Sequence, residues 1–493
     1  MARQPLPESR IMIGPLATIL REGLARPDSR VDESSGPGMS GRELEAHADL
    51  VAGLLREAGV RPHEPVHVAI GNRALDLGTF LGLWRAGAVA VPVHRAAASL
   101  TRGAIEQATR ARFRVDGLSL DRIAEALPPE RPLLEGAALV VFTSGSTGAP
   151  KGVVLGHDAL ARKLAILDRL LGFRPDDVVA VPLQLTFIFG IWASLLAIRS
   201  GARLVLVPKF TSATLADLLA AEATVLAAVP TMLRALLADG APAAPRLRAV
   251  LTGGEALSPS LTRAVCGSWP EAELVDLYGS TETGSCDFCH RPRNAATAGT
   301  IGVPTEGVSF RIVRDDGRLA PPGETGELRI RTACGMLGYL DNTAMTQSSF
   351  EADHFRTGDL ARLRPDGQVE LVGRSKEIIA RGGNKIAPLE IENALCAHPD
   401  VAAALCAGVP DARLGEAIHA VIVLKPGLVL SADELRCWAS AHLERYKVPD
   451  VIVFSDTLPS GATGKASRAM VSSLTLFRTD PSSTGLHSPP IGS

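Results

Sequence analysis

The chain has 493 residues, of which 46% are hydrophobic and 21% are charged, and its formal net charge is -2. Because this length exceeds what one hydrophobic core usually supports, we expect two or more domains. Positive and negative residues are interspersed, without the basic stripe and interleaved aromatic residues that nucleic-acid binding favours. The longest apolar stretch, from Leu185 to Ile198, is shorter than the roughly 18 residues that a membrane-spanning helix needs.

The N-terminal segment is predicted to begin the globular fold. Apolar residues at 11–13 are followed by Gly14 and Pro15, so they do not form the continuous apolar core of a signal peptide. Residues 16–24 carry leucine and isoleucine at helical spacing, which predicts an amphipathic surface helix. Without an export signal, the seven cysteines are interpreted as reduced thiols in a cytoplasmic protein.

Cys286, Cys289 and His290 match the C-x-x-C-H pattern by which c-type haem is attached. Haem attachment requires export, which nothing at the N-terminus indicates. We therefore favour the alternative, in which two small, partly buried cysteines lie near the wall of a pocket.

Residues 40–270 alternate helical patterns with short apolar runs that are rich in β-branched residues. The runs are Val66–Ile70, Leu139–Phe142, Val178–Val181, Leu204–Val207 and Ala249–Leu251. Strands that alternate with helices predict parallel sheets covered on both faces.

After residue 298 the pattern changes to closely spaced short strands, with Asp-Gly and Pro-Gly pairs marking the turns. This change predicts a β-rich subdomain. A third unit begins near Gly373, with helices expected at 390–397 and 432–445 and a strand at 417–424.

A loop rich in glycine and hydroxyl side chains follows the strand expected at 139–142. Its candidate phosphate-binding residues are Thr143, Ser144, Gly145, Ser146, Thr147, Gly148 and Lys151. Glycines let a backbone approach phosphate oxygens, which amides, hydroxyls and a cation can then bind. The loop departs from the G-x-x-x-x-G-K-[ST] pattern, because Lys151 is followed by a glycine. A glycine-rich solvent loop is the alternative for this segment taken alone.

Further motifs follow this loop along the chain. They are Tyr278-Gly279-Ser280-Thr281-Glu282-Thr283, Phe355 to Leu360, Gly373 to Ile379, Gly383 to Glu392, and Pro459 to Lys465. In their order and spacing they closely resemble the adenylate-forming superfamily, which includes acyl-CoA synthetases, peptide-synthetase adenylation domains and beetle luciferases. The resemblance extends over residues 10–471.

The resemblance implies an α/β fold. A large N-terminal domain would hold two βαβ-type sheets and the β-rich subdomain, and a small mobile α+β domain would follow. The implied boundaries are 1–372 for the N-terminal AMP-binding domain, 373–377 for the hinge and 378–471 for the C-terminal domain. Residues 472–493 are rich in Ser, Pro, Thr and Gly, so we expect a disordered tail.

The resemblance also implies ATP-dependent activation of a carboxylic acid as an acyl adenylate, with release of pyrophosphate and transfer of the acyl group to a thiol. Charge builds up between two anionic partners in such a reaction, so cations must be held there. Glu282 matches the family's magnesium ligand, Thr281 a phosphate contact and Lys465 the catalytic lysine.

The family's nucleotide contacts map onto separate motifs. Tyr278 would pack on the adenine, and Asp359 would accept hydrogen bonds from the ribose hydroxyls beside Arg374. The other candidates are Gly254, Glu255, Asp276, Gly279 and Ser280.

Lys376 matches the hinge about which the small domain of these enzymes rotates between adenylation and thiol transfer. Gly382 and Gly383 would line the channel for a pantetheine thiol, because glycine leaves room for that arm. The implied cofactors are ATP, Mg²⁺, and either CoA or a phosphopantetheinylated carrier protein.

The acid pocket is expected around residues 186–192, which include no acidic residue that could pair with the ammonium of an α-amino acid. Phe187 stands where many acyl- and aryl-CoA ligases have a histidine. The candidate pocket residues are Phe187, Phe189, Trp192, Val229, Gly253, Gly254 and the segment from Ser285 to Phe288, with core packing as the alternative for each. We therefore expect an apolar acyl or aryl acid.

The acceptor is predicted to be CoA, with a separate carrier protein as the alternative. A silent nucleotide-binding relative is disfavoured, because Lys465, Glu282 and Asp359 are all present. A luciferase-like oxygenase has no support beyond shared ancestry. The protein is expected to be a monomer or homodimer without nucleic-acid partners or a membrane span.

Replacing Lys465 by alanine should abolish acid-dependent exchange of pyrophosphate into ATP, because the cation between carboxylate and phosphate is lost. Transfer of the acyl group from a supplied acyl adenylate to the thiol should be largely retained. Both half-reactions would be measured on the same preparation, and an equal loss of the two would contradict the role assigned to this lysine.

Overall fold

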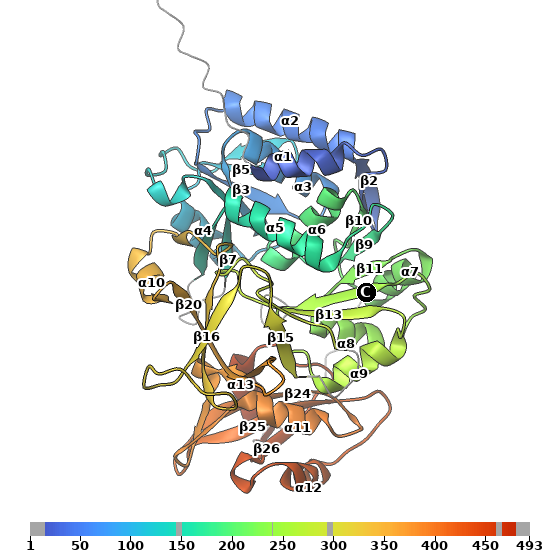
Figure 1. The fold of residues 1–493 in the computed structure, drawn as a ribbon, viewed down its shortest axis with the longest axis vertical. Helices are drawn as coiled ribbons and strands as arrows, with labels where there is room; N and C mark the ends of the chain where they lie inside the picture. The colour runs from blue at the N-terminus through green and yellow to red at the C-terminus, as the bar shows by residue number, and fades with distance from the viewer. Residues whose placement is uncertain (1–14, 144–149, 239, 293–298, 460–465, 480–493) are drawn as a thin grey trace, which may run out of the picture.

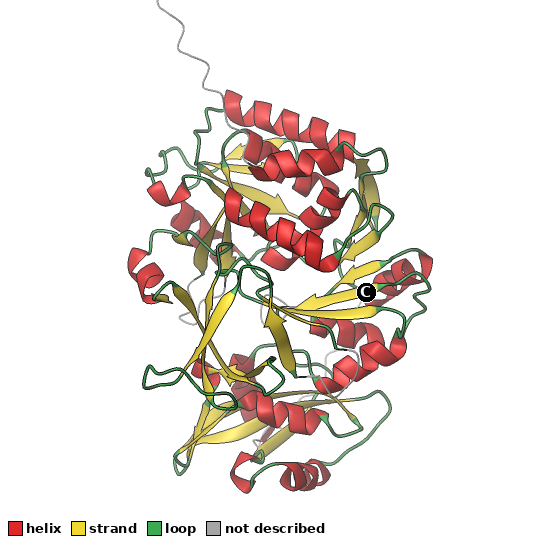
Figure 2. Ribbon diagram, in the orientation of Figure 1, coloured by secondary structure: helices red, strands yellow, loops and turns green. Residues whose placement is uncertain are grey.

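The computed structural model describes residues 15–143, 150–238, 240–292, 299–459 and 466–479. In Figure 1 a larger N-terminal part lies above a smaller C-terminal part, and Figure 2 shows helices packed against sheets in both. Within the described ranges, no helix has both the length and the apolar character needed to cross a bilayer. The predicted α/β class is confirmed.

The first sheet has seven strands in the order β18-β8-β7-β4-β3-β5-β6. Its strands are β3 (Pro65–Ile70), β4 (Val89–His94), β5 (Phe113–Asp116), β6 (Ser119–Arg122), β7 (Ala137–Thr143), β8 (Lys151–Gly156) and β18 (Gly338–Tyr339). Strands β7, β4, β3 and β5 run parallel, as the alternation with helices predicts. Antiparallel pairing of Thr143 with Lys151 places both ends of the predicted phosphate loop at the carboxyl end of β7.

The second sheet begins with a parallel array. Its strands here are β1 (Arg30–Glu33), β2 (Gly36–Ser40), β9 (Val178–Val181), β10 (Arg203–Leu206), β11 (Val225–Ala227), β12 (Ala249–Gly253) and β13 (Glu273–Tyr278). All except the antiparallel edge strand β2 run in the same direction, in the order β13-β12-β11-β9-β10-β1. Their carboxyl ends therefore lie along one edge.

The predicted β-rich subdomain continues this sheet instead of forming a separate one. Its strands are β14 (Phe288–His290), β15 (Thr300–Pro304), β16 (Ser309–Val313), β17 (Thr325–Arg331), β19 (Phe350–Glu351), β20 (His354–Leu363) and β21 (Val369–Arg374). β14 pairs antiparallel with β13 on one side and with β15 on the other. A sheet of 14 strands results.

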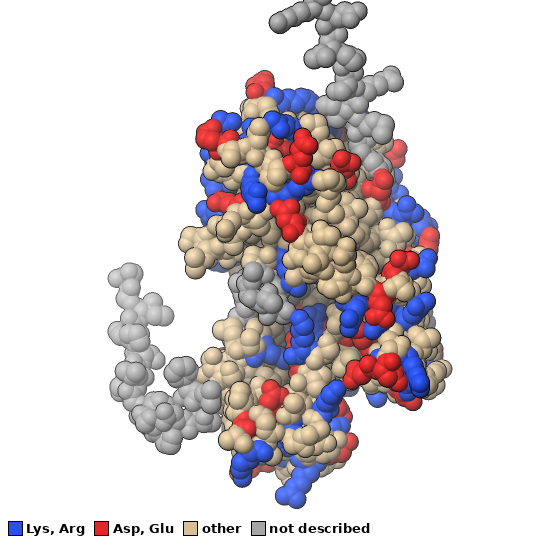
Figure 3. Space-filling model, turned by 90° about the vertical axis from the view of Figure 1, so that its left-hand side faces the viewer, with Lys and Arg blue, Asp and Glu red and all other residues tan. Residues whose placement is uncertain are grey.

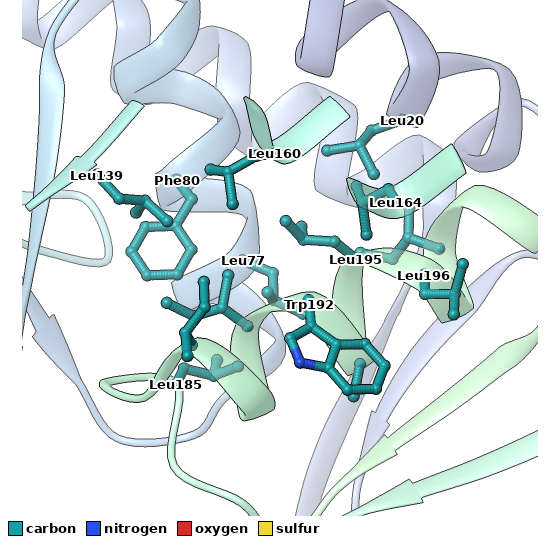
Figure 4. Close-up of a cluster of buried hydrophobic side chains, with 14 of the residues drawn as sticks. Leu20, Leu77, Phe80, Leu139, Leu160, Leu164, Leu185, Trp192, Leu195 and Leu196 are labelled. Carbon is teal, nitrogen blue, oxygen red and sulfur yellow. The ribbon is translucent and has the colours of Figure 1, made fainter. Parts of the chain in front are cut away.

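Helices cover both sheets. They are α1 (Pro15–Leu24), α2 (Gly41–Glu57), α3 (Ala74–Arg85), α4 (Ser99–Thr109), α5 (His157–Leu171), α6 (Ile188–Ser200), α7 (Ser212–Ala221), α8 (Pro230–Ala238), α9 (Pro259–Ser268) and α10 (Thr343–Ser348). Leu16, Leu20 and Leu24 of α1 are at most 2% exposed and share a core with Phe80 and Trp192, part of which Figure 4 shows. The predicted N-terminal helix is confirmed.

The C-terminal part has its own sheet and core. Its elements are β22 (Ile379–Arg381), β23 (Asn384–Ile386), α11 (Pro388–Cys396), β24 (Val401–Asp411), β25 (Gly415–Leu424), α12 (Ala432–His442), β26 (Val451–Phe454) and α13 (Val471–Thr479). The strand order is β23-β22-β25-β24, with β26 beside β25. The helices and the strand predicted from the sequence correspond to α11, α12 and β25.

One prediction for the C-terminus is wrong. Residues 472–479, assigned to a disordered tail, belong to helix α13. Val471 and Thr475 are fully buried, the helix lies against β24, β25 and β26, and Thr475 Oγ1 is hydrogen-bonded to His419 Nδ1 over 2.7 Å. The Ser-rich and Thr-rich composition concealed the four-residue spacing of this buried face. Residues 480–493 lie outside the described residues.

Asp276, a candidate nucleotide residue, lies in the middle of β13 and is 7% exposed. Burial raises the pKa of its carboxyl from an ordinary 3.8 to about 7, although the backbone amide of Leu277 opposes the shift. Between these two pKa values, the Asp276 carboxyl is protonated in the folded protein and ionised in the unfolded chain. Stability contributed by this proton is complete below about pH 4 and is lost as the pH rises towards 7.

The substitution Asp276→Asn should remove this pH dependence, because the amide stays neutral. Between pH 4 and pH 8 the wild type should lose on the order of 4 kcal/mol of unfolding free energy that the variant retains. Urea unfolding of both proteins at the two pH values measures the difference. Asp217→Asn, at an exposed position of α7, serves as the control. Parallel pH profiles for wild type and Asp276→Asn would contradict the shift.

Candidate active site

The carboxyl ends of the parallel strands carry several of the predicted nucleotide residues. β12 ends at Gly253, just before Gly254 and Glu255, and β13 ends at Tyr278. Open α/β sheets bind ligands outside these ends. Figure 3 shows Lys and Arg side chains gathered where the molecular face is hollowed between its upper and lower parts. This charge favours an anionic ligand.

Tyr278, Asp359 and Arg374 are brought together from three strands. Asp359 of β20 faces Arg374 of β21 in the register of the sheet, and Arg374 Nε lies 2.8 Å from Asp359 Oδ1. Tyr278 Oη, from β13, donates to Asp359 Oδ2 over 2.6 Å. Three residues predicted from three separate motifs therefore form one contact set.

The electrostatics of this set are those of a buried acceptor. Burial raises the pKa of the Asp359 carboxyl, and Arg374 and Tyr278 oppose that shift. Burial beside Asp359 also raises the pKa of the Tyr278 phenol, which therefore remains a donor. A carboxylate held by two donors keeps further lone pairs for hydroxyl groups. The arrangement fits the predicted ribose contact.

Glu282 lies in the turn after β13 and contacts the first sheet. Tyr339 Oη, on β18, donates to Glu282 Oε1 over 3.0 Å. Lys151 Nζ, at the start of β8, lies 5.7 Å from the centre of the Tyr339 ring, within range of a cation–π interaction. One tyrosine therefore contacts both the predicted metal ligand and the cation beside the predicted phosphate loop.

This donor chemistry fits a magnesium ion bound together with phosphates. Mg²⁺ is usually held by one or two carboxylates and by substrate phosphate oxygens. Glu282 supplies a hard carboxylate oxygen that Tyr339 orients. Thr281 is in the same turn, where its carbonyl accepts from the Gly284 amide over 3.1 Å.

The turn that carries Thr281 and Glu282 has an unusual backbone. Gly284, Ser285 and Cys286 have consecutive positive φ values of 77°, 68° and 53°. Gly279 is required by this geometry, because a side chain there would collide with the Cys286 amide. The Ser280 amide donates to Thr283 Oγ1 over 3.2 Å and closes the turn.

Other predicted nucleotide residues have different neighbours. Glu255 accepts from Thr231 Oγ1 over 2.7 Å and lies 3.3 Å from Arg234. Gly254 has a φ of 80°, which explains the glycine. The residues Ser144, Gly145, Ser146, Thr147, Gly148 and Lys465 lie outside the described residues.

The candidate acid pocket adjoins the main core. Phe189 stacks on Trp192 at 5.0 Å between ring centres, and Trp192 is 1% exposed. Figure 4 places Trp192 among buried leucines. Phe187 occupies the N-cap position of α6, and Val229 packs against the same core. For Trp192 the structure therefore supplies the core-packing role that the sequence left open.

Gly253 and Ser285 have structural roles of their own. A side chain at Gly253 would collide with the Leu277 carbonyl of the neighbouring strand. Ser285 lies in the left-handed turn, and its Oγ is 3.6 Å from Cys286 Sγ. The close approach of the neighbouring strand therefore explains the glycine at position 253.

The predicted hinge and thiol residues lie at the junction of the two parts. Lys376 is in a 3₁₀ turn, Ser375–Glu377, between β21 and β22. Gly382 and Gly383, with φ values of 55° and 82°, form the two-residue turn between β22 and β23. A two-residue hairpin turn of this kind requires positive φ at both positions. The backbone geometry alone therefore explains both glycines, without reference to a thiol channel.

Cys286 and Cys289 are buried, at 1% and 8% exposure. Burial raises the pKa of the Cys286 thiol to about 12 and also raises that of Cys289. Both thiols are therefore protonated at neutral pH, as expected of buried structural cysteines.

Sequence reasoning missed two residues that contact this site, Tyr339 and Lys163, and it included Asp287 only as part of the candidate pocket segment 285–288. No local spacing links Tyr339 to Glu282, which is 57 positions away. Lys163 could have been noticed, because it occupies the apolar face of α5 between Leu160 and Leu164. A lysine at such a position needs a buried partner.

Comparison with known proteins places this geometry in a family. The AMP-binding enzyme family matches residues 24–116 and 106–340, and its C-terminal domain matches residues 390–465. A feruloyl-CoA synthase of Amycolatopsis sp is 31% identical over 93% of this chain and 96% of its own length.

Two further proteins are similar over most of the chain. ScoC of Streptomyces coeruleorubidus, a fatty acid–[acyl-carrier-protein] ligase, is 31% identical over 73% of this chain and 70% of its own length. The crystal structure of the anthranilate CoA ligase AuaEII with anthranoyl-AMP superposes with a TM-score of 0.83 at 25% identity, covering 93% of this chain and 97% of that one. The chain therefore belongs to the family of AMP-binding, adenylate-forming enzymes and is an AMP-forming acid–thiol ligase.

Proposed function

We propose that this protein activates an apolar aryl or acyl acid with ATP and Mg²⁺, releases pyrophosphate, and transfers the acyl group from the adenylate to CoA. The observation that carries the proposal is the contact set of Tyr278, Asp359 and Arg374, three residues from separate strands joined by hydrogen bonds of 2.6 Å and 2.8 Å. Such a set suits a nucleoside with an aromatic base and two hydroxyls.

In this mechanism each group has a defined task. Asp359 accepts from the ribose hydroxyls, with Arg374 beside it, and Tyr278 packs on the adenine. Glu282 would hold the magnesium ion, which neutralises charge on the phosphates. Lys151 and the loop before it bind phosphate oxygens, and Lys465 bridges carboxylate and phosphate during attack. The remaining proposed nucleotide contacts are Gly254, Glu255, Asp276, Gly279, Ser280 and Thr281.

The acid class is inferred from charge. No acidic side chain occurs between Thr186 and Trp192, so the ammonium of an α-amino acid would be buried without a counter-charge. Phe187 and Phe189 offer aromatic surface at the start of α6. The names of two relatives, a feruloyl-CoA synthase and an anthranilate CoA ligase, are consistent with an aromatic acid.

For the acceptor we propose CoA, with the phosphopantetheine arm of a carrier protein as the second candidate. The carrier is favoured by one similar protein, the fatty acid–[acyl-carrier-protein] ligase ScoC. In either case we propose that residues 378–471 rotate about Lys376 against residues 1–372, which would bring Gly382 and Gly383 to the thiol.

A pyrophosphate-exchange screen over aryl, fatty, hydroxy and amino acids tests the acid class. Exchange should be strongest with an apolar aryl or acyl acid, because the pocket segment lacks a counter-charge for ammonium. AMP release with CoA, and then with a panel of phosphopantetheinylated carriers, identifies the acceptor. Exchange confined to amino acids would contradict the proposal.

The substitution Asp359→Asn should raise KM for ATP at least tenfold. The amide keeps the shape of the side chain, but it loses the charge that strengthens hydrogen bonds to ribose, a loss of about 1.5–3 kcal/mol. Steady-state kinetics at saturating acid measure the effect. The same substitution at the turn residue Asp366 is the control, and an unchanged KM in Asp359→Asn would remove the ribose role.

A further inference from the structure

We propose that Lys163 is a positioning residue for the adenylation step, because its buried ammonium holds the turn that carries Thr281 and Glu282. This inference rests on the proposed function, since it assigns Glu282 to the metal. Lys163 itself lies on α5 and belongs to none of the motifs described above.

The burial of Lys163 is nearly complete. Its side chain is 2% exposed, and that of its partner Asp287 is 0% exposed. Neighbouring residues on the same helix face are Leu160, Leu164 and Leu167. Removing an ammonium from water is costly, so its contacts must be specific.

Lys163 Nζ reaches two groups of the loop after β13. It lies 3.4 Å from Asp287 Oδ1 and donates to the Cys286 carbonyl over 3.4 Å. Thr305 Oγ1 donates to the same carbonyl over 2.9 Å. The lysine therefore holds the backbone of the loop as well as a side chain.

Asp287 connects Lys163 to the turn that carries Thr281 and Glu282. Its Oδ2 accepts a hydrogen bond from Thr283 Oγ1, and its amide donates to the Tyr278 carbonyl over 2.7 Å. Thr283 in turn is bonded to Ser280. The chain of contacts from α5 thus ends at the residues on either side of Thr281 and Glu282.

The turn needs such a hold because its backbone is strained. Ser285 and Cys286 have positive φ values of 68° and 53°, although neither is glycine. Residues in this conformation persist where the surroundings over-determine them, which is common at functional sites. The Cys286 carbonyl, held by Lys163 and Thr305, belongs to one of these two residues.

A role in stability alone is a weaker explanation. The cost of desolvating two charges offsets most of their attraction, so a buried ion pair adds little net stability over apolar side chains. What it does supply is a defined position for each partner. Here the positioned group is the turn that carries Glu282, the proposed carboxylate ligand of the metal.

The test compares Lys163→Met with a matched control, Arg112→Met. Arg112 and Glu64 form another buried pair, with 6% and 2% exposure and an N–O distance of 2.8 Å, and they lie directly before β5 and β3 of the first sheet. Methionine replaces the cation in each variant by an unbranched apolar side chain, which is shorter than lysine and arginine. Binding of Mn²⁺ in the presence of ATP is followed by electron paramagnetic resonance, and both half-reactions are assayed.

In Lys163→Met the Mn²⁺ concentration for half-saturation should rise at least tenfold. Pyrophosphate exchange should fall through a higher KM for ATP, and acyl transfer from a supplied adenylate should change less than threefold. Arg112→Met should lower the melting temperature to a similar extent and shift Mn²⁺ binding less than twofold. Equal shifts of Mn²⁺ binding in the two variants would overturn the inference.

If Lys163→Met does not fold, Asp287→Asn decides the question. This variant still contains Thr283, and Lys163 can still donate to the Cys286 carbonyl. It should raise the half-saturating Mn²⁺ concentration at least threefold. A smaller increase would overturn the inference. A wild-type protein that neither binds Mn²⁺ with ATP nor exchanges pyrophosphate would instead contradict the proposed function.

Discussion

The reversal of the chain after β13 is the constraint on which the rest of the site depends. β13 runs parallel to β12 on one side and antiparallel to β14 on the other, and residues 279–287 make the turn. β14 pairs with β15, and β15 pairs with β21, so this turn joins the parallel half of the sheet to its β-rich half. The same turn carries Glu282, so one strained segment determines both the sheet architecture and the position of the proposed metal ligand.

The joining of the two halves of the second sheet explains how distant motifs meet. Tyr278 ends a parallel strand, whereas Asp359 and Arg374 belong to antiparallel strands of the β-rich half. The continuous sheet therefore holds the strands that carry these side chains. Tyr339 adds a second connection, since it belongs to the first sheet and bonds to Glu282. The site therefore lies where three sets of strands converge.

Much of the fold was predictable because its signals are local. Alternating apolar runs identified β3, β7, β9, β10 and β12, and leucine spacing identified α1. Helix α13 was missed, because Val471 and Thr475, the buried residues among its described side chains, lie in a segment whose composition suggests disorder. The continuity of the 14-strand sheet was also beyond sequence reasoning, since strand pairing depends on long-range register.

The residues of the site likewise divide into those that local motifs predicted and those that only the structure identified. Tyr278, Asp359 and Arg374 were predicted from motifs as nucleotide contacts, whereas the hydrogen bond of Tyr278 to Asp359 was not predicted and is seen only in the structure. The roles of Gly253, Gly382 and Gly383 as required glycines emerged only from the packing and φ values. Tyr339 acts across 57 positions, a distance at which single-sequence patterns carry no information.

The buried pair of Lys163 and Asp287 also bears on how this sequence can change over evolutionary time. Losing one partner leaves an uncompensated charge in the protein interior, which costs far more than losing both. A lineage can therefore leave this state only by two nearly simultaneous substitutions or through a poorly folded intermediate. We expect the two positions to vary together among close relatives, as a lysine with an aspartate or as two neutral residues.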